Sequence, residues 1–104
     1  MEIREYVTRD GKVPFNEWLK KLRDQRALEK ILTRIDRLET GNTGQCKSLG
    51  EGLHELRIHY GPGYRVYFGN VGNCIILLLC GGDKASQQQD IKRARRYWND
   101  CRRR

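Results

Sequence analysis

The chain has 104 residues, which suffice for one domain with one hydrophobic core, whereas two domains of half this length would each be too small to hold a core. Its 21 Lys and Arg against 13 Asp and Glu give a net charge of +8, which favours nucleic acid, an acidic protein or an anionic surface as partner. The N-terminus is charged at once and the apolar run CIILLLC is far too short to span a bilayer, so the sequence predicts neither a signal peptide nor a membrane helix.

The first half of the chain predicts one strand followed by two helices. Residues 3–7 alternate as a short strand does, and a proline suits the first turn of an amphipathic helix over residues 14–23. Asp24 can cap a second helix, whose apolar stripe runs to about residue 40. Two helices joined so closely are expected to form an antiparallel hairpin, and a polar loop over residues 41–52 follows them.

The next segment predicts two antiparallel strands, because apolar and polar side chains alternate along both of them. A three-residue turn at residues 61–63 would place Tyr60 opposite Tyr64. His59 would then lie opposite Arg65. The polar face of this pair carries Glu55, Arg57, His59, Arg65 and Tyr67.

The run of residues 74–80 shows no alternation, which is typical of a strand buried on both faces, and it completes a three-stranded meander. Cys74 and Cys80 at its ends should therefore be buried. Because the four cysteines include no C-x-x-C pair, we expect free thiols in a reducing cytoplasm rather than disulfides or a zinc site.

Ser86 and Gln89 fit a capping box at the start of a final helix. The side of this helix away from its apolar stripe is strongly basic and includes Lys92, Arg93, Arg95 and Arg96. Such a run is consistent with a solvated helix face, or with phosphate contacts to RNA or to a ribosomal surface. The order of elements predicts a small single α+β domain over residues 1–104, with an N-terminal strand, a helical hairpin, a three-stranded antiparallel meander and a C-terminal basic helix.

The charged face formed by Glu55, Arg57, His59 and Arg65 has two interpretations. One is a solvated face with cross-strand ion pairs such as Glu55 with Arg65. The other is a phosphodiester site, in which the arginines hold the phosphate and stabilise charge while a carboxylate or histidine transfers the proton. No metal or other cofactor is expected, because the two histidines would face opposite sides of their strand and no run of carboxylates offers a magnesium site. RNA cleavage here would use the substrate's own 2′-hydroxyl.

Several motifs are shared with a known group of proteins. They are KSLGEGLHELR at 47–57, GYRVYF at 63–68, CGGDK at 80–84 and DIKRA at 90–94, together with Phe15, Trp18 and the pair Tyr97 and Trp98. In these motifs the sequence resembles the RelE/ParE superfamily of toxins from type II toxin–antitoxin modules, and more closely the addiction-module killer proteins related to HigB toxins. The likeness covers nearly the whole chain.

The resemblance implies a microbial RNase-like fold and, in the RelE branch, an mRNA interferase. Such toxins enter the ribosomal A site and cut translated mRNA without a metal, leaving a 2′,3′-cyclic phosphate and a 5′-hydroxyl. A cognate antitoxin, usually one with a helix-turn-helix DNA-binding domain, neutralises them, and the pair commonly represses its own operon. The expected location is the cytoplasm.

The resemblance also implies roles for single residues. Arg65 falls on the arginine that stabilises the scissile phosphate, and Arg57 falls on a basic position that faces the same phosphate. Lys84 stands where relatives often place a basic residue that assists the leaving group. Lys47 is an expected RNA contact.

Two positions depart from the pattern of the family. Relatives carry a second basic residue where Glu55 stands, so Glu55 becomes a candidate general base, as does His59. A tyrosine that relatives carry near the C-terminal end is absent from residues 87–90. These departures leave room for a ParE-like inhibitor that acts by binding DNA gyrase, or for a non-toxic basic RNA-binding module.

Overall fold

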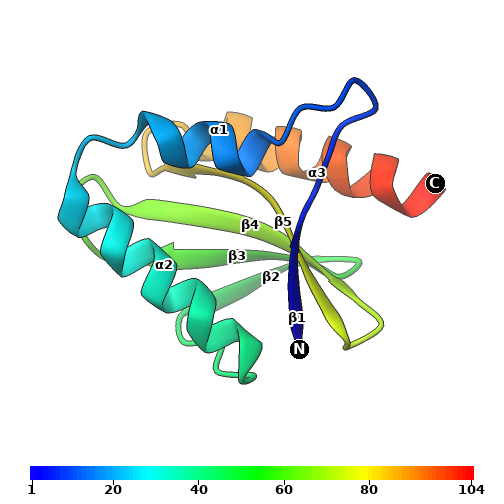
Figure 1. The fold of residues 1–104 in the computed structure, drawn as a ribbon, viewed down its shortest axis with the longest axis horizontal. Helices are drawn as coiled ribbons and strands as arrows, with labels where there is room; N and C mark the ends of the chain where they lie inside the picture. Colours follow the sequence, from blue (N-terminus) through cyan, green and yellow to red (C-terminus); the bar gives the residue numbers. More distant parts are fainter.

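The computed structural model describes residues 1–104 and contains five strands and three helices (Figure 1). In chain order they are β1 (Glu2–Glu5), α1 (Pro14–Lys21), α2 (Gln25–Glu39), β2 (Cys46–Gly50), β3 (Leu53–Ile58), β4 (Tyr64–Val71), β5 (Ile75–Asp83) and α3 (Gln87–Arg103). The strands form one sheet in the order β1-β5-β4-β3-β2, in which β1 is parallel to β5 and the other pairs are antiparallel. The predicted α+β fold is confirmed. None of the helices combines the length and the apolar character that crossing a bilayer requires.

The predicted polar loop over residues 41–52 is wrong in its second half, because residues 46–50 form the edge strand β2. Gly50 pairs with Leu53, so Glu51 and Gly52 form a tight turn between β2 and β3. Both turn residues have positive φ angles, 55° and 86°, as a type I′ hairpin requires. Glycine adopts this conformation readily, so Gly52 was the local signal for the hairpin.

The register of β3 against β4 also differs from the prediction. Arg57 lies opposite Arg65, which displaces the pairing by two residues. The strand ends at Ile58 because the chain turns there: the Tyr60 N–H donates to the Ile58 carbonyl, and the Gly63 N–H donates to the Tyr60 carbonyl. Since side chains alternate along a strand with a period of two, this displacement leaves the residues within β3 and β4 on their predicted faces.

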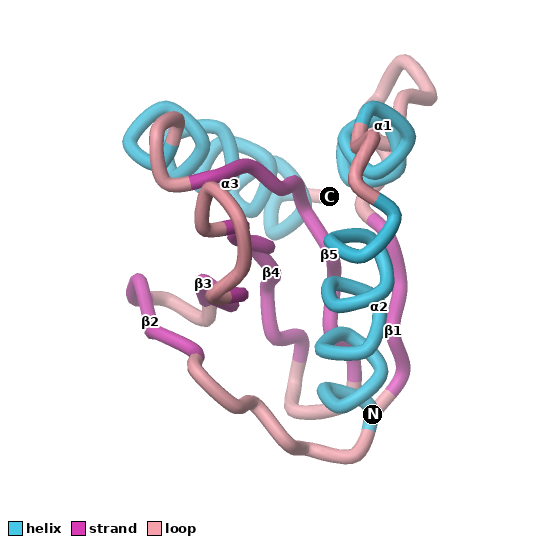
Figure 2. The backbone as a smooth tube through the Cα atoms, turned by 90° about the vertical axis from the view of Figure 1, so that its left-hand side faces the viewer, coloured by secondary structure: helices cyan, strands magenta, loops and turns pink.

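Helices α1 and α2 cover one face of the sheet and α3 covers the other, so the molecule has two apolar cores (Figure 2). In the first core, Phe15 of α1 and Ile31 of α2 pack with strand residues such as Leu56. In the second, Trp98 of α3 packs with strand residues that include Tyr67. The polar face predicted for β3 and β4 is therefore partly covered by α3.

Strand β5 lies between β1 and β4 and contributes to both cores, as its lack of alternation predicted. Residues 76 and 78 pack in the first core, and residues 77 and 79 pack in the second. Cys80 is buried, but Cys74 is exposed in the turn before β5, so the prediction that Cys74 is buried is wrong. All four cysteines are free thiols.

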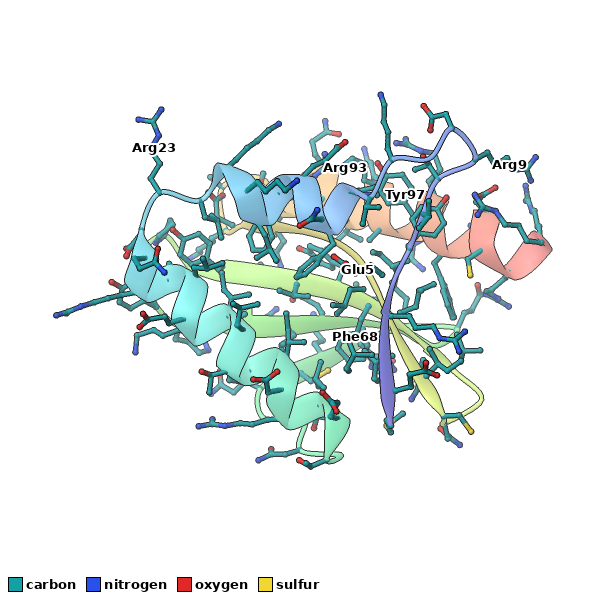
Figure 3. The ribbon with its side chains drawn as sticks, viewed as in Figure 1. Glu5, Arg9, Arg23, Phe68, Arg93 and Tyr97 are labelled. Atoms are coloured by element: carbon teal, nitrogen blue, oxygen red, sulfur yellow. The ribbon has the colours of Figure 1, made fainter.

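Helices α1 and α2 follow each other directly but diverge from their joint, and each packs on the sheet rather than along the other (Figure 1). The prediction that they form an antiparallel hairpin is therefore wrong. Trp18 of α1 is seated on β5, where a Cβ at Gly81 would lie 2.3 Å from the indole. Asp24 caps α2 as predicted, because its carboxylate accepts hydrogen bonds from two N–H groups of the first turn at 3.0 and 3.2 Å. Arg23 projects from the joint away from the fold (Figure 3).

The turn before α3 places several polar residues at one end of the sheet. Ser86 occupies the N-cap position, but its side chain donates to the Asp90 carboxylate instead of making the predicted capping bond. Asp83 stabilises the turn that precedes the helix, since its carboxylate accepts from the backbone N–H groups of Ala85 and Ser86 at 2.9 and 3.2 Å. This tight turn brings Lys84 and Gln87 to the ends of β3 and β4.

Candidate functional site at the end of β3 and β4

A buried carboxylate organises the polar side chains at this end of the sheet. Glu55 of β3 has no exposed surface and lies between Lys47 of β2 and Tyr67 of β4 in the sheet register. Its carboxylate accepts hydrogen bonds from Arg57 Nε at 2.8 Å, the Tyr67 hydroxyl at 3.1 Å and Gln87 Nε2 at 3.0 Å. Burial raises the pKa of Glu55, but these hydrogen bonds outweigh burial, so the pKa lies below its ordinary value.

Two arginines lie directly opposite each other beside this carboxylate. Arg57 and Arg65 are register partners, a placement in which like charges repel. Glu55 offsets the repulsion, because one of its oxygens accepts from Arg57 and the other lies 3.9 Å from Arg65 Nε. Arg65 Nη1 also donates to the Gly63 carbonyl at 2.8 Å, while Arg65 Nε is buried without a hydrogen-bond partner. The two guanidinium groups are thus held in place by the fold.

The interpretation as a solvated face is wrong for Glu55 and Arg65, which are both buried. The ion pair between Glu55 and Arg65 is present, but only 10% of the Arg65 side chain is exposed and Tyr67 is fully buried. Arg57 is the more accessible arginine, with 34% of its side chain exposed. These side chains are shielded from solvent because the first turn of α3 lies over this part of the sheet. There Gln87 contacts Glu55, which is 32 residues away in the sequence.

Two lysines border the arginines. Lys84 is exposed just after β5. The turn at Gly63 lies next to both Lys84 and Arg65, because a Cβ at Gly63 would be 3.5 Å from Lys84 Cβ and 3.3 Å from Arg65 Nη1. Lys47 is exposed on the edge strand and is the direct partner of Glu55, so it shares that face of the sheet. The structure therefore brings together the four residues that we call the arginine cluster: Arg57, Arg65, Glu55 and Lys84.

Two residues of this region were not predicted to belong to the site. Tyr67 lies two residues after Arg65, so the prediction placed both on the same face of the sheet, which is correct. Its hydrogen bond to Glu55 could not be predicted, because that contact depends on the register of β3 against β4. Gln87 had no signal in the sequence, because its position depends on how α3 docks. No three His, Cys, Asp or Glu side chains are grouped as metal ligands.

His59 lies apart from the arginine cluster, so its predicted place opposite Arg65 is wrong. It follows the end of β3 and is exposed, and its Nε2 contacts the Gln45 side chain. It lines a groove beside α2 together with Lys30 and Arg34. Because α2 covers the opposite face of the sheet, His59 is not positioned to act as a base for a phosphate held by Arg65.

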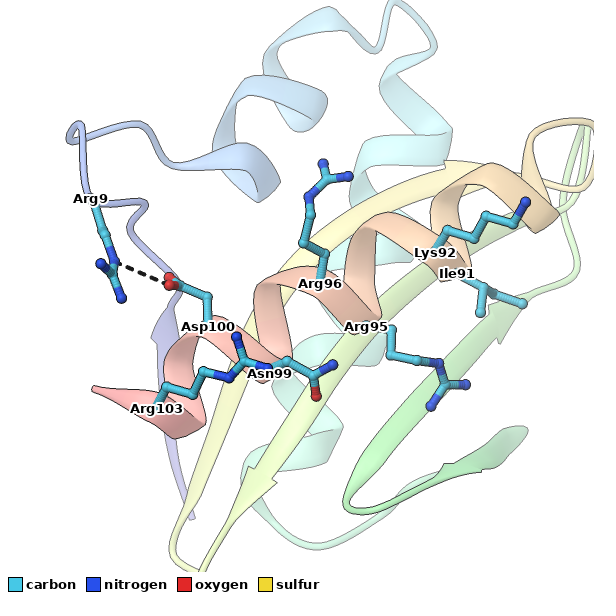
Figure 4. Close-up of a pocket in the computed structure, with 8 residues that line it drawn as sticks. All are labelled: Arg9, Ile91, Lys92, Arg95, Arg96, Asn99, Asp100 and Arg103. Atoms are coloured by element: carbon cyan, nitrogen blue, oxygen red, sulfur yellow. Dashed lines mark hydrogen bonds and ion pairs between the residues drawn. The ribbon is translucent and has the colours of Figure 1, made fainter.

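The predicted RNA-binding residues of α3 fall into two sets. Lys92, Arg95 and Arg96 line an open groove of about 560 Å³ on the outer side of the helix, which we call the α3 groove (Figure 4). Arg93 is not part of it, because its guanidinium pairs with Asp90 at 2.6 Å. The helix therefore presents a defined basic surface rather than an even distribution of charge.

The α3 groove carries an excess of positive charge. Arg9 and Arg103 also line it, and its single acidic residue is Asp100. Asp100 accepts from the Tyr6 hydroxyl at 2.6 Å and pairs with Arg104 at 2.6 Å and with Arg9 at 3.2 Å. The other four cations of the groove have no carboxylate partner, which is the property of a surface that binds phosphates.

The lowered pKa of Glu55 predicts a specific acid sensitivity. A carboxyl group with a lower pKa in the folded state stabilises the fold above its ordinary pKa of 4.5, and this contribution is lost as the pH falls through the folded-state value. The free energy of unfolding, measured with urea from pH 7 to pH 3, should therefore fall below about pH 4.5. Glu55→Gln should make this decline with pH less steep. The decline that remains comes from other acidic groups such as Asp100, whose pKa is also lowered, chiefly by its hydrogen bond from the Tyr6 hydroxyl. An unchanged slope in Glu55→Gln would contradict the assignment.

Comparisons with known proteins identify the family of the chain. The family model described as phage derived protein Gp49-like (DUF891) matches residues 17–99, which include the arginine cluster and most of α3. An uncharacterized protein of Haemophilus influenzae is 52% identical over 81 residues, which cover 78% of this chain and 82% of the relative. The chain therefore belongs to the phage-derived Gp49-like family, a family of addiction-module toxins.

Proposed function

We propose that this chain is the toxin of a toxin–antitoxin pair and that it acts as a ribosome-dependent endoribonuclease on translated mRNA. The observation that carries the proposal is the arginine cluster, in which Arg57 and Arg65 pair with the buried carboxylate of Glu55 and Lys84 lies beside the Gly63 turn that also contacts Arg65. The excess positive charge suits a phosphodiester, and the planar guanidinium groups suit the oxygens of a five-coordinate phosphorus.

In the proposed reaction, the 2′-oxygen of the RNA forms a bond to the adjacent phosphorus while the bond from phosphorus to O5′ breaks. The 2′-hydroxyl gives its proton to solvent, because no side chain of the arginine cluster is free to accept it. O5′ takes a proton from Lys84, which solvent then reprotonates, so the products are a 2′,3′-cyclic phosphate and a 5′-hydroxyl. Arg57 and Arg65 stabilise the charge that develops on the phosphoryl oxygens, and Lys84 donates the proton to the leaving oxygen. The proposed reaction needs no metal, because the arginines neutralise this charge.

Glu55 is better suited to orient the arginines than to act as the general base. Its carboxylate is fully buried and already accepts hydrogen bonds from Arg57, Tyr67 and Gln87. A general base needs access to the substrate proton and a pKa near the working pH, whereas the pKa of Glu55 is lowered. In our proposal Glu55 is therefore a positioning residue that holds Arg57 and Arg65 side by side.

Surfaces outside the arginine cluster support binding to a large RNA. The α3 groove supplies Lys92, Arg95, Arg96 and Arg103, and Lys47 extends the positive charge along β2 beside the cluster. These residues would contact backbone phosphates in the ribosomal A site, where the message is also presented. The proposed protein partner is a cognate antitoxin with a helix-turn-helix domain, and the proposed place of action is the cytoplasm.

The test is cleavage by the purified chain of one mRNA, either translated in an extract or free in the same buffer. We expect cuts only in the translated message, and the upstream fragments should end in a 2′,3′-cyclic phosphate. Arg57→Ala should remove this activity, while Arg23→Ala, an exposed substitution at the joint of α1 and α2, should keep it. No cleavage in either setting, or full activity in Arg57→Ala, would rule the proposal out.

A binding inhibitor of DNA gyrase is the second candidate. It is favoured by one observation, that Glu55, the one carboxylate beside the arginines that could accept a proton, is fully buried. This function predicts that the purified chain inhibits gyrase supercoiling in the absence of ribosomes and that Arg57→Ala inhibits equally well. Supercoiling by gyrase that is unaffected by a molar excess of the chain would exclude it.

A further inference from the structure

A second basic groove lies on the opposite face of the sheet from the α3 groove. It runs between α2 and the end of β3, has a volume of about 680 Å³, and we call it the α2 groove. Its lining includes three cations of α2, Lys30, Arg34 and Arg37, and the polar pair Gln45 and His59. None of the three cations takes part in the proposed chemistry at the arginine cluster.

The charges of the α2 groove are not neutralised within the protein. Lys30, Arg34 and Arg37 form no ion pair with a carboxylate, and Glu29 is the single acidic residue of the lining. Lys30 lies over the Tyr60 ring at 5.2 Å from its centre, which leaves the ammonium free for another partner. The groove therefore has an excess of positive charge and favours an anionic ligand.

Arg34 connects this groove to the arginine cluster. Its Nη1 donates to the backbone carbonyl of Arg57 at 2.8 Å, and its Nη2 lies 3.5 Å from the Thr43 carbonyl. These contacts hold the half-buried guanidinium in place, while its remaining N–H donors are available. The backbone of Arg57 thus joins the arginine cluster on one face of β3 to the α2 groove on the other.

We propose that the α2 groove is a subsite for a nucleotide of the single-stranded RNA that flanks the cleaved bond. This inference rests on the proposed ribonuclease function. Lys30, Arg34 and Arg37 would hold the backbone phosphate of that nucleotide, and Gln45 and His59 would contact its base edge.

The composition of the groove distinguishes RNA from a protein partner. Ile58 is its one hydrophobic lining residue, whereas protein–protein interfaces have an apolar centre with aromatic anchors. Guanidinium and amide groups without such a centre fit a phosphate and a base instead. The occupant of the α2 groove is therefore RNA rather than a segment of the antitoxin.

The test is the salt dependence of RNA binding, measured by fluorescence anisotropy with a labelled, fully 2′-O-methylated oligonucleotide that cannot be cut. Each phosphate contact contributes about 0.7 to the slope of log affinity against log salt for a single strand. Because Lys30 and Arg37 would help to hold one phosphate, Lys30→Ala with Arg37→Ala should lower the slope by about 0.7, while Lys20→Ala with Arg23→Ala should leave it unchanged. All four side chains are on exposed residues, so both double variants should keep the wild-type melting temperature.

A slope that is unchanged in the variant lacking Lys30 and Arg37 would overturn the proposal, and it is also the result that a protein occupant predicts. A second measurement addresses the base contacts: Gln45→Ala should reduce the differences in affinity among oligonucleotides of different sequence, and unchanged differences would remove Gln45 from the subsite. Neither assay depends on cleavage. If the chain failed to cut mRNA but the slope fell as expected, the ribonuclease proposal would fail and the RNA-binding groove would stand.

Discussion

Arg65→Ala should reduce the cleavage of translated mRNA by at least about 100-fold, the loss expected when one donor to a developing oxyanion is removed. Arg65 is the most deeply buried cation of the arginine cluster, and its guanidinium is held by the Gly63 carbonyl and by Glu55. A donor fixed in this way needs no reorganisation when charge develops on the phosphate. Initial rates of cleavage in a translating extract measure the effect.

The burial of Arg65 calls for a control on folding. Removing it leaves Glu55 with one cation fewer, so Arg65→Ala should also lose about 1–3 kcal/mol of stability. Arg57→Ala provides the matched comparison, because this arginine is 34% exposed and should lose activity with a smaller loss of stability. Arg23→Ala should change neither quantity. An Arg65→Ala variant that is folded at the assay temperature and cuts at the wild-type rate would exclude a role for Arg65 in the chemistry.

Glu55→Ala should lower the free energy of unfolding by about 3–5 kcal/mol, the range found when one partner of a buried ion pair is removed. The substitution leaves Arg57 and Arg65 opposite each other without a counter-ion. It also leaves the Tyr67 hydroxyl and the Gln87 amide without their acceptor. Urea unfolding at pH 7 measures the loss.

Two further variants place this value in context. Glu51→Ala removes a carboxylate whose pairing with Arg102 at 3.2 Å is exposed, so its loss should stay within about 1 kcal/mol. Leu78→Ala creates a cavity in the core between α1, α2 and the sheet, and should lose about 2–5 kcal/mol without changing the slope of stability against pH below 4.5. If Glu55→Ala were as stable as Glu51→Ala, the buried carboxylate would not be what holds the cluster together.

The predictions that were confirmed depend on local properties of the chain. The unbroken apolar run predicted β5 as a strand buried on both faces, and Asp24 was recognised as a cap because capping involves only the next three residues. The predictions that failed depend on the end of an element. Cys74 was expected inside β5 but precedes it. The edge strand β2 was missed because Gly52, whose positive φ angle allows the hairpin turn after β2, was assigned to a loop.

By itself, the sequence determined that Glu55, Arg57 and Arg65 share one face of the sheet, because the alternation of side chains along a strand is local and survives a displacement of two residues. Only the tertiary structure decided that this face is buried at Glu55 and half-open at Arg57. That outcome depends on the docking of α3, which brings Gln87 onto a carboxylate 32 residues away, and no periodicity within one segment records such a contact. The same docking buries the Glu55 carboxylate, and for this reason we propose that it positions the two arginines instead of acting as the general base.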